Sequence, residues 1–347
     1  MIKSKPFLAL AAACCILTAT SSRADITVND PSYGLTSYYT YAGSGSIVSY
    51  DWAANGSLYY MVQAPSFTFG GLNQVSAGVT TTVVAASSDF VGASVISIGD
   101  YVYFNTSDSS AQKIYKYGPV SGAASSTLAS TTANYGLYAH GGKVFISGST
   151  SFTTSYLYES GVDGSGNLTN NPAVQFGNVG SGGSGPLAFD NIGNLYYAPG
   201  FGDHSIYKWS ASQVEAALAD PAGSGLTLTG ALWGNYDSLY GSLSGATSLL
   251  LDGNGHLLVT LTNFSNSSVL ASFGIDGSGN FSGQNTTILT DDGLLGELRQ
   301  HDGATYISGG DSIYQLGAVP EPATVASLLL GLAVVVFVFR RREQPVR

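Results

Sequence analysis

A hairpin-sized pattern recurs along the chain, and it restricts the fold more than any other feature of the sequence. The clearest copy, PLAFDNIGNLYYAP at residues 186–199, has an apolar stretch ending in Asp190, a turn with Gly193 and Asn194, and a Tyr-rich stretch. Apolar and aromatic strand formers on both sides of a Gly/Asn turn predict a β-hairpin. Similar copies are found at residues 49–62, 95–104, 136–147, 249–260 and 297–308.

The spacing of these hairpins indicates repeats of one size. Their turn glycines are Gly56, Gly99, Gly142, Gly193, Gly255 and Gly303, at intervals of 43, 43, 51, 62 and 48 residues. Further strand signals follow at residues 113–118, 155–161, 205–210, 269–277 and 312–317. Periods of about 40–50 residues with short strands are typical of four-stranded propeller blades. We therefore predict an all-β protein with a six-bladed β-propeller, and a β-sandwich or a β-helix is the alternative.

Two segments need special roles in such a ring. Residues 210–220 have a helical composition with a stop at Pro221, so we interpret them as an insertion that accounts for the 62-residue interval. After residues 313–316 the chain enters its C-terminal tail, which leaves the last blade one strand short. An unpaired outer edge is a liability in a β-sheet. We expect residues 35–41 to supply the missing strand and to lie beside Leu316.

The first residues predict export. Lys3 and Lys5 precede an apolar run at residues 7–17, and a small-x-small cleavage site ends at Ala24. Such a run has the length of a secretory signal and is too short to cross a bilayer. We expect residues 1–24 to be a signal peptide that signal peptidase removes, with Asp25 as the first mature residue.

Cysteine and charge exclude several functions for the mature chain. Both cysteines, Cys14 and Cys15, lie in the predicted signal, so no disulfide, zinc–thiolate site or cysteine nucleophile is expected beyond it. Residues 25–318 contain five basic and twenty acidic side chains, a net charge of −15. A surface of this sign repels phosphate backbones, which argues against nucleic acid as a partner.

The C-terminal tail predicts a membrane helix. Residues 323–339 carry no charge, and as a helix they would rise about 26 Å, near the lower limit for crossing a bilayer. Prolines before this run mark its start, and three arginines after it would stay in the cytoplasm and leave the preceding domain outside. We therefore predict a single transmembrane helix at residues 323–339 that holds the chain in the inner membrane.

The tail contains three parts in a fixed order: Val319-Pro320-Glu321-Pro322, the apolar run, and Arg340-Arg341-Arg342. This order resembles the PEP-CTERM protein-sorting signal, a family of Gram-negative bacteria that make exopolysaccharide. The resemblance implies that residues 319–347 are handled by a membrane enzyme called exosortase and that the protein is delivered to the cell envelope. An ordinary C-terminal anchor is the alternative. The repeats of residues 25–318 resemble those of NHL-type and related six-bladed propellers.

No combination of residues predicts catalysis or a metal site. The near copies VDGSGNLT at residues 162–169 and IDGSGNFS at residues 275–282 alternate oxygen-bearing side chains as calcium loops do, but both lack the closing bidentate carboxylate. We interpret them as tight turns between third and fourth strands, and Asp190 and Asp252 as turn hydrogen-bonders. The histidines fall in different repeats and are not expected to form a site; they are His140, His204, His256 and His301.

A binding or scaffold role fits these observations best. Aromatic rings can stack on sugars, and the candidates, each of which also suits core packing, are Trp52, Trp209, Trp233 and Tyr236. We predict an exported, envelope-sorted surface or matrix protein whose propeller binds without catalysis or cofactor, with exopolysaccharide as the ligand that the sorting signal suggests. The competing interpretation is a calcium-dependent hydrolase or lyase resembling gluconolactonase, which requires three or more carboxylate or Asn side chains in the central channel.

Overall fold

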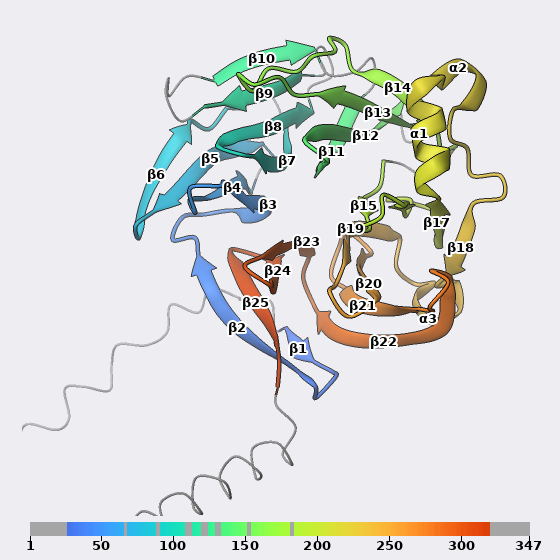
Figure 1. The fold of residues 1–347 in the computed structure, drawn as a ribbon. Coiled ribbons are helices and arrows are strands. Elements are labelled where there is room, and N and C mark those ends of the chain that lie inside the picture. Colours follow the sequence, from blue (N-terminus) through green and yellow to red (C-terminus); the bar gives the residue numbers. More distant parts are fainter. Residues whose placement is uncertain are drawn as a thin grey trace, which may run out of the picture.

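The computed structural model describes residues 26–65, 68–87, 91–107, 113–118, 124–128, 133–150, 154–180 and 184–319. Within these residues, six β-sheets surround a common centre, as Figure 1 shows. The arrangement confirms the predicted six-bladed propeller over a sandwich or a β-helix. Each sheet is antiparallel, and its first strand in sequence, apart from the N-terminal strands β1 and β2, is the innermost one.

The first blade contains β3 (Ser46–Trp52), β4 (Leu58–Gln63), β5 (Phe69–Ser76) and β6 (Val79–Val84). The second contains β7 (Val91–Ile98), β8 (Tyr101–Ser107), β9 (Lys113–Tyr117) and β10 (Ala124–Leu128). The third contains β11 (Ala133–His140), β12 (Lys143–Thr150), β13 (Thr154–Gly161) and β14 (Val174–Asn178). The fourth blade contains β15 (Leu187–Phe189), β16 (Leu195–Tyr197), β17 (Ser205–Trp209) and β18 (Leu232–Asn235). The fifth contains β19 (Gly245–Leu251), β20 (His256–Thr262), β21 (Ser268–Ile275), β22 (Phe281–Asp291) and β1 (Thr27–Val28). The sixth contains β23 (Leu295–His301), β24 (Ala304–Gly309), β25 (Ser312–Ala318) and β2 (Tyr33–Thr40).

The hairpin turns explain why the repeat is visible in the sequence. All six turn glycines used to measure the repeat have positive φ, between 61° and 90°. Glycine adopts this backbone conformation without the steric cost that a Cβ atom brings, so the residue type is fixed at this point of each blade. The later strand signals are confirmed as the third strands β9, β13, β17, β21 and β25.

The ring has two distinct faces. Each innermost strand begins at one face, where the connections between second and third strands also lie, and we call this the mouth face. The opposite face carries the turns between first and second strands and between third and fourth strands, and we call it the turn face.

The N-terminal segment closes the ring, as predicted. Strand β2 pairs antiparallel with β25, and Leu35 lies directly opposite Leu316. The last blade therefore combines three C-terminal strands with one N-terminal strand. Strand β1 was not predicted; it pairs with the outer strand β22 of the neighbouring blade, with Thr27 opposite Thr290. Both ends of the described chain are thus held by sheet pairing.

The long repeat contains the predicted helical insertion. Helix α1 (Ala211–Ala219) lies between β17 and β18 and begins with a capping box formed by Ser210 and Gln213. It is followed by α2 (Pro221–Ser224), and a third short helix, α3 (Asp237–Tyr240), precedes β19. Val214 and Ala217 of α1 are buried against the sheets.

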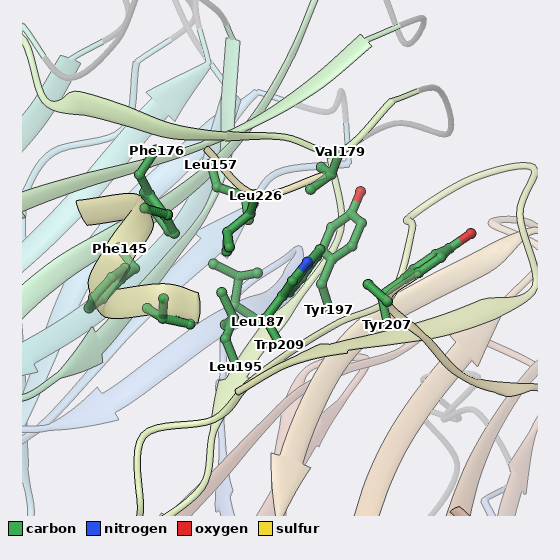
Figure 2. Packing of buried hydrophobic residues seen from close by; sticks show 13 residues of the cluster. Phe145, Leu157, Phe176, Val179, Leu187, Leu195, Tyr197, Tyr207, Trp209 and Leu226 are labelled. Carbon is green, nitrogen blue, oxygen red and sulfur yellow. The ribbon is translucent and has the colours of Figure 1, made fainter. Parts of the chain in front are cut away.

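The hydrophobic core is divided among the seams between blades. Figure 2 shows the cluster between the third and fourth blades, where Phe145 and Phe176 approach Leu187 and Trp209 across the seam. Trp209 is 2% exposed, and its indole N–H donates to the carbonyl of Thr227 at 2.9 Å. Aromatic side chains fill the triangular space between two diverging sheets because they bury a large area each.

Three sequence predictions lie outside the described residues: the signal peptide at residues 1–24, the helix at residues 323–339 and the arginines that follow it. In the part of the chain that the structure describes, no helix has the length and apolar character to cross a membrane.

Candidate binding site in the central cavity

A cavity of about 380 Å³ lies at the centre of the ring. Every blade contributes to its wall, through Val48, Ser94, Tyr138, Pro186, Thr247 and Glu297 in chain order. Connections of the mouth face also contribute to the lining, through Phe201, Phe264 and Gly310 among others. The volume is that of a small-molecule pocket, which typically measures about 300–1,000 Å³.

The innermost strands are irregular where they pass the cavity. The pairing register shifts within the first hairpin of five blades. Residues inside these shifts include Val48, Thr247 and Glu297, all of which line the cavity. A β-bulge places two residues opposite one and so changes which side chains face the channel. The cavity lining therefore depends on bulges that recur from blade to blade.

Glu297, which lines the cavity, belongs to an ion pair with little solvent exposure. Arg299 Nη1 lies 3.0 Å from Glu297 Oε1, and both residues come from β23. The guanidinium also donates from Nε to the carbonyl of Tyr50 at 3.1 Å and from Nη2 to the carbonyl of Val95 at 3.2 Å. These carbonyls belong to the first and second blades. Arg299 thus binds three blades together below the cavity.

A second carboxylate, that of the half-buried Asp51, also interacts with the positive charge of Arg299. Its oxygens accept the backbone N–H groups of Trp52 at 2.9 Å and Ser97 at 2.7 Å. Burial raises the pKa of Glu297 and of Asp51, and the nearby Arg299 opposes the rise in both. Burial lowers the pKa of Arg299, but Glu297 and Asp51 together raise it by more than burial lowers it, so the net shift of this pKa is upward. The guanidinium therefore stays charged.

Hydroxyl groups bind the carboxylate of Glu297 from both sides. Ser49 donates to Oε2 at 3.3 Å, and Ser248 donates to Oε1 at 3.4 Å. The same two hydroxyls accept backbone N–H groups of the next blade, Val95 at 3.0 Å and Leu298 at 2.9 Å. With Arg299 as well, both oxygens of Glu297 are engaged within the protein, which is unlike a free general base.

Exposed apolar side chains gather at the opening of the cavity. Phe201 and Phe264 are each 54% exposed, and Leu294 is 41% exposed. All three line the cavity and lie on mouth-face connections of consecutive blades. The cavity therefore opens on the mouth face, between two aromatic rings.

The connection that carries Phe264 is fixed by local hydrogen bonds. Asn263 Oδ1 accepts three backbone N–H groups, those of residues 265, 266 and 267, at 2.9–3.1 Å. Thr262 Oγ1 accepts the N–H of Phe264 at 2.9 Å. Phe264 itself has φ of +57°, a conformation that costs energy for any residue with a Cβ atom. The loop thus holds an exposed ring in a strained position, which is common at ligand sites.

The connection that carries Phe201 is tied to the next blade. The N–H of Gly202 donates to the carbonyl of Ser244 at 2.8 Å, and the N–H of Ala246 donates to the carbonyl of Pro199 at 3.1 Å. A Cβ atom on Gly245 would lie 2.2 Å from the carbonyl oxygen of residue 200, so only glycine allows this approach. Both aromatic rings at the opening therefore stand on fixed backbone.

The aromatic residues singled out from the sequence lie elsewhere. Trp52 and Trp209 are 7% and 2% exposed, Tyr236 is fully buried, and Trp233 is half-buried. Trp52 stacks on His301 with ring centroids 4.4 Å apart. None of the four lines the central cavity. Their observed contacts are those of packing between strands and blades, the second role that the sequence allowed.

The aspartate turns behave as the sequence predicted. Oδ1 accepts the N–H groups two and four residues later, at 2.8–3.1 Å, at Asp163, Asp190, Asp252 and Asp276. Because these oxygens cap their own turns, the calcium-loop interpretation of the two near copies gains no support. Within the described ranges, no group of three His, Cys, Asp or Glu side chains is placed to hold a metal ion.

The two near-copy turns have a further shared role. Lys116 of the second blade donates to Asn167 Oδ1 at 2.7 Å, and Lys208 of the fourth blade donates to the carbonyl of Gly279 at 2.5 Å. Each ammonium also lies 5.4 Å from the centre of a tyrosine ring of its own blade. Both turns therefore fasten one blade to the blade before it, which the sequence did not reveal.

The histidines occupy four different blades. His140 stacks on Phe189, and His301 stacks on Trp52. The other two each pair with a carboxylate, as His204 Nδ1 does with Asp237 at 2.6 Å and His256 Nδ1 does with Asp252 at 3.1 Å. Desolvation lowers the pKa of His140.

The residues that form the cavity were not identified from the sequence. One signal was available: Arg299 is the single arginine between residues 25 and 318, and it stands two positions after Glu297 in a predicted strand. A lone arginine close to a carboxylate in an acidic, apolar domain indicates a buried ion pair. Phe201 and Phe264 give no comparable signal, because exposure of a phenylalanine is not visible in sequence.

The tail matches a known sorting motif. Residues 318–342 correspond to the PEP-CTERM protein-sorting motif. The match confirms the resemblance of the tail and implies export and sorting to the cell envelope. No curated protein matches the sequence.

Solved structures with this fold share little sequence with the chain. A Thermus thermophilus protein described as a glucose dehydrogenase is 11% identical, with a TM-score of 0.53 over 82% of this chain and 100% of that one. The PQQ-bound aldose sugar dehydrogenase of Streptomyces coelicolor is 12% identical, with a TM-score of 0.52 over 84% and 99%. Virginiamycin B lyase from Staphylococcus aureus is 9% identical, with a TM-score of 0.51 over 83% and 100%.

These similarities define a fold and no activity, because propellers of one architecture carry unrelated functions. The chain is a six-bladed β-propeller protein. Its C-terminal segment is a PEP-CTERM sorting motif.

Proposed function

We propose that this protein is an exported, envelope-sorted binding protein whose central cavity takes neutral sugar rings of an exopolysaccharide. The observation that carries the proposal is the pair of exposed rings, Phe201 and Phe264, held on fixed backbone at the opening of a hydroxyl-lined cavity. Sugar rings have apolar C–H faces that pack on aromatic side chains, and burying these faces in a pocket favours binding.

The interior of the cavity suits the polar edges of a sugar. Ser46, Ser94, Thr247 and Tyr138 contribute hydroxyl groups to the lining. Thr247 donates to the carbonyl of Leu295 at 3.1 Å and Ser94 donates to that of Leu137 at 3.4 Å, which leaves the lone pairs of these oxygens to accept from a ligand hydroxyl. A ring of such groups recognises several sugar hydroxyls at once without adding charge. The lining therefore supports a carbohydrate over a purely apolar ligand.

The charges in the cavity wall and on the whole domain support a neutral ligand. Glu297 is the one carboxylate among the described residues that line the cavity, and Arg299 and two serines already bind it. The net charge of −15 on residues 25–318 works against acidic polymers. We do not extend the proposal to hydrolysis or elimination, because the single carboxylate of the described cavity wall is held by other groups.

In this proposal, the sorting tail determines where in the cell the propeller is displayed. Signal peptidase removes residues 1–24, exosortase recognises Pro320-Glu321-Pro322, and Arg340-Arg341-Arg342 hold the far end of the tail in the cytoplasm until processing. The propeller is then displayed at the envelope, where exopolysaccharide is exported.

Binding of neutral and acidic oligosaccharides to residues 25–319, which contain every strand of the closed ring, tests the proposal. We expect binding to a neutral member of the panel. The double variant F201A/F264A should weaken it by about fivefold to a hundredfold, because each stacked ring contributes about 0.5–1.5 kcal/mol and 1.4 kcal/mol is a factor of ten. Calorimetry measures both affinities.

The matched control is I192A/L232A, which removes two side chains that are 71% and 64% exposed away from the cavity. It should leave the affinity unchanged. Equal loss in both double variants, or binding confined to acidic oligosaccharides, would contradict the proposed site.

A further inference from the structure

The chain leaves the propeller on the face opposite the cavity opening. Strand β25 follows Gly310, which lines the cavity at the mouth face, and it ends at Ala318 on the turn face. There Ala318 lies opposite Tyr33, and the N–H of Val319 donates to the carbonyl of Ser32 at 2.8 Å. The start of the sorting motif is thus held by the sheet at the turn face.

Little chain separates this point from the apolar run of the tail. Three residues, 320–322, stand between Val319 and Ala323. At about 3.3–3.6 Å per residue, the distance from Val319 to Ala323 is at most about 14 Å. This is shorter than the sheet itself, because the seven residues of β25 extend over about 23 Å. The domain therefore has no tether long enough to turn over freely.

We propose that, before the tail is processed, the turn face of the last blade faces the lipid head groups and the cavity opening points away from the membrane. The proposal rests on the proposed role of residues 323–339 as a membrane anchor. The sugar-binding opening would then be accessible to polymer while the precursor is still anchored, so binding and sorting can occur in either order.

The short tether keeps the turn face close to an anionic membrane, and negative charges on this face prevent it from binding to the lipids. Asp302 in the turn of the last blade has a side chain that is 88% exposed, and Asp30 lies beside the exit of the chain. Carboxylates repel anionic lipids over a distance of about 10 Å at 0.1 M salt. We expect the turn face to move closer to an anionic bilayer when the salt concentration rises.

The ends of β2 offer a matched pair of reporter positions. Ser32 lies before this strand at the turn face, and Ser44 lies after it at the mouth face; both are exposed. The chain from Asp25 onward has no cysteine, so S32C and S44C each provide a single thiol for a fluorophore. The labelled chains, residues 25–347, are reconstituted into phosphatidylethanolamine–phosphatidylglycerol vesicles that contain head-group nitroxide lipid.

Quenching of vesicle-bound protein should be at least about twofold stronger at position 32 than at position 44, and stronger still at high salt. Equal quenching, or stronger quenching at position 44, would overturn the orientation. Protein that fails to float with the vesicles would overturn the anchor on which the orientation rests, so the two failures are distinguished.

Discussion

Arg299 shows how one side chain can organise the centre of a six-bladed ring. It contacts Glu297 of its own strand and backbone carbonyls of the first two blades, and it offsets the charge of Asp51. Its special role could be suspected from the sequence because the domain has no other arginine. The partners could not be predicted, since Tyr50 and Val95 approach it only once the ring has closed.

The variant R299M tests this organisation. It preserves much of the side-chain length but leaves Glu297 and Asp51 buried without a cation, and breaking a buried pair in this way costs about 3–5 kcal/mol. We expect that loss in the free energy of unfolding, measured by urea at pH 7. The double variant E297Q/R299M removes one of the stranded carboxylates and should recover part of it. A loss below about 1 kcal/mol in R299M would mean that the pair does not stabilise the ring.

Among the secondary-structure elements, features that depend on nearby residues were predictable from the sequence, and features that depend on neighbouring strands and blades were not. The hairpins follow from Gly, Asn and Asp at turns, where the backbone itself selects the residue type, as Gly193 and Asp190 illustrate. The bulges that place Thr247 and Glu297 in the cavity depend on the neighbouring strand and blade. For the same reason, docking of the near-copy turns on Lys116 and Lys208 could not be anticipated from the turns alone.

The turn at Asp276 should make stability depend on pH. Backbone N–H groups of Asn280 and Ser278 lower the pKa of this carboxyl below its ordinary value of 3.8. A lowered folded-state pKa means that the stabilisation is complete above pH 3.8 and is lost as the pH falls through the folded-state value. Wild type should therefore have a higher melting temperature than D276N at pH 7, and this difference should shrink as the pH falls below 3.8.

The variant E215Q controls for the change in net charge, because Glu215 is an exposed acid of α1. Thermal melts of both variants between pH 7 and pH 2 provide the comparison. If the melting difference for D276N is the same across this range, or matches that of E215Q, the hydrogen-bonded carboxylate does not account for it.

For the whole molecule, the closed ring was predictable by counting strands. Six hairpins and five later strand signals indicated six blades, the last of them one strand short, and the N-terminal segment at Leu35 supplies that strand opposite Leu316. The position of the proposed binding site was not predictable, because the cavity forms only where six innermost strands converge. The stacking candidates named from the sequence each also suited core packing, and they pack between strands and blades, whereas Phe201 and Phe264 stand at the opening of the cavity.

We propose that a neutral sugar polymer binds at the mouth face, and hydrogen–deuterium exchange of residues 25–319 with and without a bound oligosaccharide can detect such binding. Backbone protection should appear in the connections at residues 199–204 and 262–267, which carry Phe201 and Phe264. The turns of the opposite face should exchange as before. Protection confined to those turns, or spread evenly over all blades, would contradict the claim.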